Sequence, residues 1–172
     1  MNITFDNIRQ HVTPMSDFRL KWRFTEEQYD KLPNHHLDQL QPLDNEASNF
    51  LWDYVTNIHL YHNAPFNKDL FRIIDKVKVV GNNKKEIKKW LYHRGLPFDK
   101  QVFLSWQPTD AMIVPWKLLI KYFDSFYYPS DDLTVIDPSL TWALLFHHKD
   151  EIYFGTNKDF KPSTTFADTD FI

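Results

Sequence analysis

The sequence predicts an α+β protein in which helices pack on one antiparallel sheet. Residues 44–123 contain apolar residues at helical spacing, whereas residues 133–154 hold three short β-rich runs separated by turn residues. Helices that precede an antiparallel meander in this way are typical of the α+β class. The length of 172 residues suits one domain. We therefore expect a single domain over residues 1–172, in which 1–17 and 157–172 can be loosely attached termini.

The first predicted elements are a strand and a helix. Phe18 to Phe24 alternates apolar and basic residues, the period of a half-buried strand. Asp44 is a good N-cap residue for the helix that follows. That helix is predicted from apolar residues at helical spacing, namely Ala47, Phe50, Leu51, Tyr54, Val55, Ile58 and Tyr61.

Two further helices are predicted in the middle of the chain. After Pro65, four apolar residues repeat the helical pattern until Gly81; they are Leu70, Ile73, Ile74 and Val77. Lys84 to Arg94 then forms a short basic helix, which Gly95 and Pro97 end.

The C-terminal half predicts one strand, one helix and three hairpin-linked strands. Val102 to Trp106 is the strand, and Pro115 begins the helix. The meander consists of Leu133–Ile136, Thr141–His147 and Glu151–Phe154. The residues expected in the core are Phe50, Leu51, Trp116, Phe123, Trp142, Leu144 and Phe154.

Composition excludes several functional classes. The absence of cysteine removes disulfides, thiolate metal sites and cysteine nucleophiles, and favours a reducing compartment. Three glycines far apart leave no Gly-rich phosphate loop. Residues 1–12 match neither a signal peptide nor a membrane span. We expect a cytoplasmic protein without a membrane partner.

Charge is distributed unevenly along the chain. Residues 68–100 hold ten Lys or Arg and four Asp or Glu, a balance of +6. Residues 123–172 hold nine acidic and three basic residues, a balance of −6. The two segments therefore suggest two different kinds of binding surface.

Three stretches carry a resemblance to a known group of proteins. They are Phe18-Arg-Leu-Lys-Trp-Arg-Phe, Leu40-Gln-Pro-Leu43 and WALLFHHKDEIYFG from Trp142 to Gly155. With them, the chain resembles a family of small single-domain bacterial proteins of unassigned function. A helix opened by Pro115-Trp116, then Tyr128-Pro-Ser-Asp-Asp132, then hairpin strands that end in Ile152-Tyr-Phe-Gly155 are similar to immunity proteins of polymorphic toxin and contact-dependent growth inhibition systems, a likeness that spans roughly residues 18–156. The resemblance implies a toxin inhibitor, and these families have no catalytic signature to carry over.

Neither a metal site nor a catalytic site is predicted. The histidine pairs are His35-His36, His59 with His62, and His147-His148, and each needs a third ligand. Adjacent strand residues point to opposite faces, so His147 and His148 can share a metal only if the turn rotates His148. No serine lies in a nucleophile-elbow context. We expect no enzyme activity, no cofactor and no metal.

The acidic C-terminal third is the predicted partner-binding site. Turns of one sheet can gather carboxylates that are distant in sequence, and tyrosines add contact area. A basic toxin, such as a nuclease, would be attracted to such a surface and blocked by it. The residues assigned to the site are Tyr127, Tyr128, Asp131, Asp132, Asp150 and Glu151.

The alternative is a nucleic-acid-binding or housekeeping domain that uses the basic helix. Its residues would be Lys84, Lys85, Lys88 and Lys89, with Trp90 and Tyr92 for base stacking. The net charge of −3 argues against general affinity for nucleic acid. Four lysines on a helix can also be a solvated face.

Overall fold

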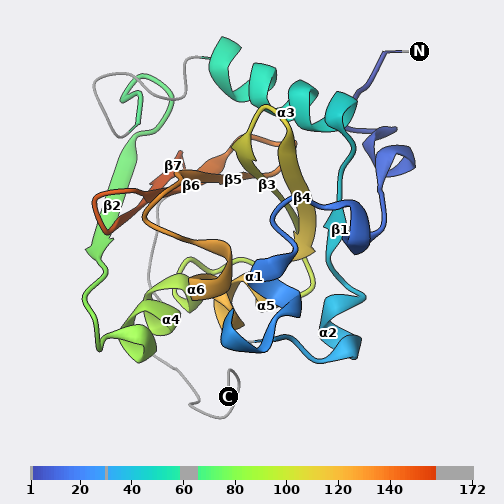
Figure 1. Cartoon of the computed structure of the whole chain (residues 1–172). Coiled ribbons are helices and arrows are strands. Elements are labelled where there is room, and N and C mark those ends of the chain that lie inside the picture. The colour runs from blue at the N-terminus through green and yellow to red at the C-terminus, as the bar shows by residue number, and fades with distance from the viewer. Residues whose placement is uncertain (1, 30, 59–65, 158–172) are drawn as a thin grey trace.

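The computed structural model describes residues 2–29, 31–58 and 66–157, and it is built around one sheet of seven strands. The strand order is β1-β4-β3-β5-β6-β7-β2, and every neighbouring pair is antiparallel (Figure 1). The strands are β1 Gln41–Pro42, β2 Ile73–Lys78, β3 Gln101–Gln107, β4 Asp110–Pro115, β5 Leu133–Ile136, β6 Trp142–His147 and β7 Glu151–Thr156. The α+β fold with a C-terminal meander, β5 to β7, is confirmed.

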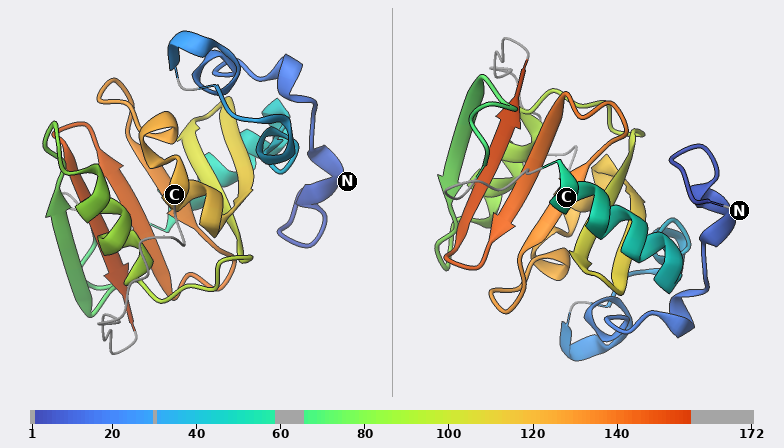
Figure 2. Two further views of the ribbon diagram at one scale, coloured as in Figure 1. Left: turned by 90° about the horizontal axis from the view of Figure 1, so that it is seen from below. Right: turned by 90° about the horizontal axis from the view of Figure 1, so that it is seen from above.

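Helices cover both faces of the sheet. One face carries α3, and the other carries α1, α4, α5 and α6 (Figures 1 and 2). The helices are α1 Trp22–Thr25, α2 Asn34–Leu37, α3 Asn45–Asn57, α4 Lys84–Tyr92, α5 Trp116–Lys121 and α6 Phe123–Phe126, and the 3-10 turns are η1 Ile8–His11, η2 Met15–Asp17 and η3 Glu27–Tyr29. The sheet is therefore the middle of three layers.

Several predicted boundaries are confirmed with their physical cause. The Asp44 carboxylate accepts a hydrogen bond of 2.9 Å from the Ala47 amide and so caps α3. Pro115 is the N-cap of α5, just before the helix. The basic helix and four of the five predicted strands are present as α4, β3, β5, β6 and β7. The predicted end of the first helix at Tyr61 lies outside the described residues.

The predicted strand over Phe18–Phe24 is wrong. The segment is a turn followed by the single helical turn α1. Leu20 and Phe24 are buried as the alternation required, but so is Arg23, which alternation would place in solvent. The Arg23 guanidinium pairs with an aspartate and lies against aromatic rings. A local sequence pattern does not reveal this tertiary pairing.

The predicted helix over Leu70–Val77 is also wrong, because Ile73–Lys78 forms β2. This segment pairs with β7 at the edge of the sheet. Isoleucine and valine favour strands, and Lys76 and Lys78 on the exposed edge discourage pairing with another chain. β4 was not predicted, because it is buried on both faces and has no alternation.

Each face of the sheet has its own apolar core. The α1, α4, α5 and α6 side holds Trp116, Phe123, Trp142, Leu144 and Phe154, all predicted to be buried. The α3 side holds Leu51, also as predicted, whereas Phe50 is only partly buried. Residues 1–17 supply the fully buried Ile8 to that second core.

Candidate functional site

Four of the predicted partner-binding residues, Tyr127, Asp132, Asp150 and Glu151, lie at or beside the turn between β6 and β7, whereas Tyr128 and Asp131 contact Arg23. The three-residue turn His148-Lys149-Asp150 ends with Asp150 in the left-handed region at φ 59°, as in hairpins that close on a type I turn. Asp132, just before β5, contacts this turn from a distant part of the chain. Its Oδ1 accepts a hydrogen bond of 2.7 Å from the His148 amide and lies 2.9 Å from His148 Nδ1. Asp132 and Asp150 are both exposed.

Tyr127 lies beneath this turn and is buried. Its hydroxyl donates a hydrogen bond to the His147 carbonyl. Burial, together with the negative charges of Asp150 and Asp132, raises the pKa of Tyr127 to about 12. Tyr127 therefore holds the hairpin in place and offers little contact area to a partner.

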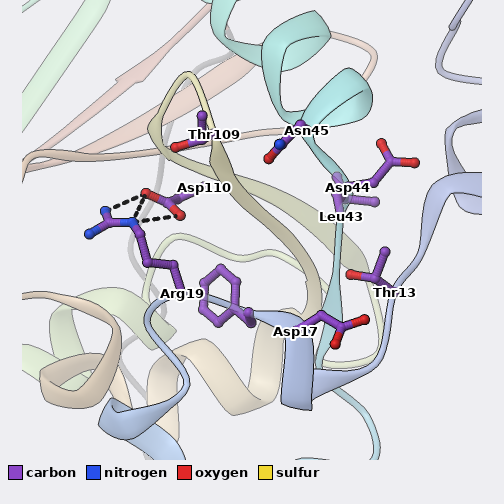
Figure 3. A pocket seen from close by; sticks show the side chains of 9 residues that line it. Thr13, Asp17, Arg19, Leu43, Asp44, Asn45, Thr109 and Asp110 are labelled. Atoms are coloured by element: carbon purple, nitrogen blue, oxygen red, sulfur yellow. Dashed lines mark hydrogen bonds and ion pairs between the residues drawn. The ribbon is translucent and has the colours of Figure 1, made fainter.

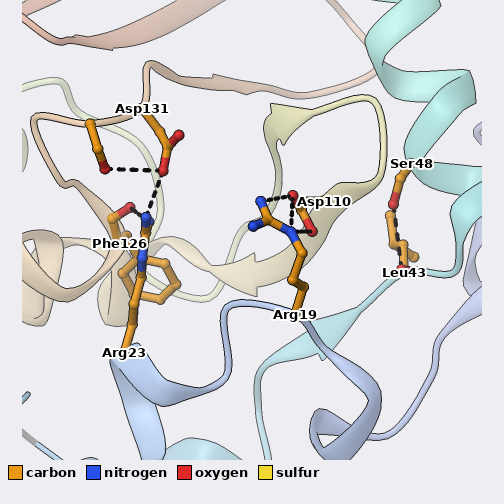
Figure 4. A network of polar contacts seen from close by, with 8 residues as sticks. Arg19, Arg23, Leu43, Ser48, Asp110, Phe126 and Asp131 are labelled. Carbon is orange, nitrogen blue, oxygen red and sulfur yellow. Dashed lines mark hydrogen bonds and ion pairs between the residues drawn. The ribbon is translucent and has the colours of Figure 1, made fainter.

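Asp131 pairs with an arginine of the interior. Its Oδ2 lies 2.7 Å from Nη2 of Arg23, whose side chain is 1% exposed (Figure 4). The Arg23 guanidinium also lies over the Tyr128 ring, 4.3 Å from its centroid. Asp131 thus neutralises a buried charge, which makes it a structural residue of this region.

Glu151 belongs to a polar row on β6, β7 and β2. It accepts a hydrogen bond from Tyr153, and it pairs across the strands with His147 and with Lys78. The Tyr153 hydrogen bond lowers the pKa of Glu151, and the positive charges of Lys76 and Lys78 act in the same direction. Part of the Glu151 charge is therefore balanced within the protein.

The same turn brings together a group of metal-ligating side chains. Asp132, His147 and His148 each offer one ligand atom, and these atoms lie within 4.8 Å of one another. The turn rotates His148 so that its ring centroid is 4.1 Å from that of His147, contrary to the expectation for adjacent strand residues. The His35 and His36 rings are equally close, but they are not part of such a group, and His59 and His62 lie outside the described residues.

An aromatic cluster that sequence reasoning missed adjoins Tyr128. Trp22 lies edge-to-face against Tyr128 at 5.3 Å and against Tyr29 at 4.7 Å between centroids. Tyr29 is 36% exposed, and the exposed Glu26 and Glu27 precede it. The only signal in the sequence was the density of aromatics, which does not distinguish a core from a surface. We call Trp22, Tyr29, Tyr128, Asp132 and Asp150 the acidic aromatic surface.

A separate pocket of about 460 Å³ lies between the N-terminal segment, the β3–β4 turn and the start of α3 (Figure 3). Arg19 reaches across to Asp110, to whose carboxylate its Nε donates at 3.0 Å. A second carboxylate of the pocket, that of Asp44, caps α3 and lies 2.8 Å from His11 Nδ1. The carboxylates of Asp44 and Asp110 are thus engaged in contacts that hold the N-terminal segment.

The basic helix presents lysines beside a tryptophan that is covered on one face. Lys84 pairs with Asp124. Burial lowers the pKa of Lys88, and the positive charges of Lys121 and Lys84 act in the same direction. Lys85 is exposed and Lys89 is partly buried. Trp90 is covered by Arg94, whose guanidinium lies 3.9 Å from the ring centroid. A base could therefore not stack on that face of Trp90.

Within the described ranges, no helix combines the length and apolar character that crossing a membrane requires. Comparison of the chain with protein-family models, with curated proteins and with solved structures finds no match.

Proposed function

We propose that this chain is a non-enzymatic immunity protein, which acts in the cytoplasm by binding a basic toxin domain through the acidic aromatic surface. The observation that carries the proposal is the continuity of this surface. The Trp22 ring contacts both Tyr29 and Tyr128. The Tyr128 carbonyl accepts a hydrogen bond from the Asp131 amide, and the next residue, Asp132, binds the His148 amide of the β6–β7 turn. Segments near residues 25, 130 and 150 thereby form one patch.

The chemistry of this surface suits a protein partner. Trp and Tyr supply much of the binding energy in interfaces, because they bury large areas and lose little conformational freedom. The exposed carboxylates of Asp132 and Asp150, with Glu26 and Glu27 nearby, would accelerate encounter with a positively charged partner. A toxin that cleaves nucleic acid needs a positive active site, so this surface would cover it and exclude its substrate.

The test uses the toxin domain encoded directly upstream of this gene, if one is found there. Tyr29→Ala should weaken binding at least roughly tenfold and reduce growth protection, because it removes an aromatic anchor. Phe98→Ala is the matched control, since Phe98 is 39% exposed and lies beyond α4. Asp150→Asn, which tolerates the left-handed backbone, should slow association and flatten its salt dependence.

The nucleic-acid alternative has one observation in its favour, the gathering of lysines from α4 and α5. Lys84, Lys88 and Lys121 are close enough to influence one another electrostatically. If Tyr29→Ala and Asp150→Asn bind and protect like the wild type, while charge reversal of Lys84, Lys85, Lys88 and Lys89 abolishes both, the basic helix is the binding surface. The absence of any upstream toxin gene together with nucleic-acid binding by α4 would also contradict the proposal.

A further inference from the structure

We propose that Asp132, His147 and His148 form a binding site for a divalent transition-metal ion of the kind that Zn²⁺ represents. The inference does not depend on the proposed function, because it concerns the isolated chain. It rests on the convergence of two imidazoles and one carboxylate, whose ligand atoms lie within 4.8 Å of one another. Among the residues described, this is the one such group of three.

The hairpin explains why the three side chains converge. Asp132 continues β5, which pairs with β6 in a register that places Leu133 opposite Phe146. Asp132 and His147 therefore end neighbouring strands side by side. His148 is the first residue of the turn, where the backbone leaves the strand, and its amide is bound to Asp132 at 2.7 Å. The turn thus directs His148 toward Asp132.

The fold also restrains the three ligands. The Tyr127 hydroxyl binds the His147 carbonyl, and the Val79 amide binds the Asp150 carbonyl at 2.7 Å. The His147 ring accepts a hydrogen bond of 3.2 Å from the Lys149 amide. Ligand atoms around a tetrahedral Zn²⁺ lie about 3.4 Å apart, given bonds near 2.1 Å. Metal binding would require side-chain rotations that bring the ligand atoms from within 4.8 Å of one another to that spacing.

The ligand types select the metal class. Imidazole with carboxylate suits Zn²⁺ and its neighbours in the transition series, whereas Mg²⁺ and Ca²⁺ prefer oxygen ligands alone. Three protein ligands leave a fourth tetrahedral position for water or for a group from another molecule. Metal binding replaces the hydrogen bond between His148 Nδ1 and Asp132: the neutral ring then carries its single proton on Nε2, so the Nδ1 lone pair and the carboxylate oxygen become ligands.

Calorimetric titration of the untagged, chelator-treated protein with Zn²⁺ tests the site. We expect one ion per chain, with Mg²⁺ and Ca²⁺ unable to compete. His147→Ala, His148→Ala and Asp132→Asn should each weaken Zn²⁺ binding by roughly tenfold or more. Asp132→Asn keeps an acceptor oxygen for the His148 amide, so it separates metal binding from the integrity of the hairpin. Co²⁺ in place of Zn²⁺ should give the visible spectrum of a tetrahedral complex.

His35→Ala is the matched control, because the His35 and His36 rings are also 4.1 Å apart but lack the carboxylate. It should bind Zn²⁺ like the wild type. Binding that survives Asp132→Asn would reduce the site to two histidines and overturn the assignment. Binding that none of the three variants affects would place the metal elsewhere, for example at His59 and His62. Loss of toxin binding or protection has no bearing on these outcomes.

Discussion

Two arginines of the same short segment pair in opposite ways with an aspartate of β4 and an aspartate of the segment before β5. Arg23 has a side chain 1% exposed, and its partner Asp131 is 19% exposed. Arg19 is 61% exposed, and its partner Asp110 is 2% exposed. In the first pair the cation is in the interior, and in the second pair the anion is. Both ion pairs join residues about a hundred positions apart (Figure 4).

The comparison shows that an ion pair cannot be judged by its distance alone. Removing one partner leaves the other where the fold placed it, and a charge left in the interior costs far more than one left in water. Stability is therefore most sensitive to substitution of the more exposed member of each pair, because its loss leaves the buried member unpaired. Four predictions test this, from the largest expected effect on stability to the smallest.

Asp131→Ala should destabilise the protein by about 3–5 kcal/mol, because it leaves the Arg23 charge buried without its anion. Urea unfolding followed by tryptophan fluorescence measures the loss. The double variant with Arg23→Met should recover part of it, since no buried charge then remains. A cost of Asp131→Ala below about 1 kcal/mol would show that the Phe126 carbonyl and the Tyr128 ring are enough for Arg23.

Arg19→Ala should cost about 1–3 kcal/mol, because Asp110 then keeps a buried carboxylate without its three hydrogen bonds from Arg19. Asp110→Ala should cost less, since Arg19 is exposed and can turn to water. The same unfolding measurement compares the two variants. Equal costs, or the reverse order, would contradict the rule that burial of the remaining partner decides the effect.

Asp137 extends the comparison to a buried aspartate held by several donors. Burial by itself raises its pKa, but hydrogen bonds from Ser139, Lys100 and Trp142 outweigh burial and leave the pKa below the ordinary value. The folded state then binds this proton less readily than the unfolded state, so the stabilisation is present above about pH 4 and is lost as the pH falls through the folded-state pKa.

Asp137→Asn should therefore lower stability by about 1 kcal/mol near neutral pH and reduce the acid dependence of unfolding. Trp142 Nε1 donates to Asp137 at 2.9 Å, so one of the six tryptophans that contribute to the fluorescence signal lies at this site. Unfolding curves from about pH 3 to pH 7 would decide the matter. An unchanged slope of stability against pH would mean that other carboxylates cause the acid sensitivity.

Asp132→Ala should have the smallest effect on stability, below about 1 kcal/mol, because both Asp132 and His148 are exposed. Its neighbour Asp131 provides the contrast, because alanine substitutions at the two adjacent aspartates would then lower the free energy of unfolding by amounts that differ several-fold. The variant should nevertheless lose Zn²⁺ binding, which separates a residue placed for binding from one placed for stability. A large loss of stability would remove that distinction.

The sequence alone determined the elements whose signals are local. Asp44 caps α3 through its own carboxylate, and the meander follows from turn residues between β-rich runs. The amphipathic spacing of Ile87 and Leu91 likewise identified α4. Each of these depends on interactions within a few residues, so a single sequence contains them. The candidate binding residues at the C-terminal turns followed from the same local signals.

Tertiary structure decided what depends on distant partners. The spacing of apolar residues from Ile73 to Val77 is compatible with a helix. The segment forms β2 because it pairs with the edge of β7 through backbone hydrogen bonds. The local pattern would place Arg23 in solvent, but Asp131 and Tyr128 enclose its guanidinium. Asp131 is therefore a structural residue. The site at Asp132, His147 and His148 exists because a turn and a strand end meet across the sheet. A local pattern cannot encode such choices, because the free energy that settles them comes from contacts between segments far apart in the chain.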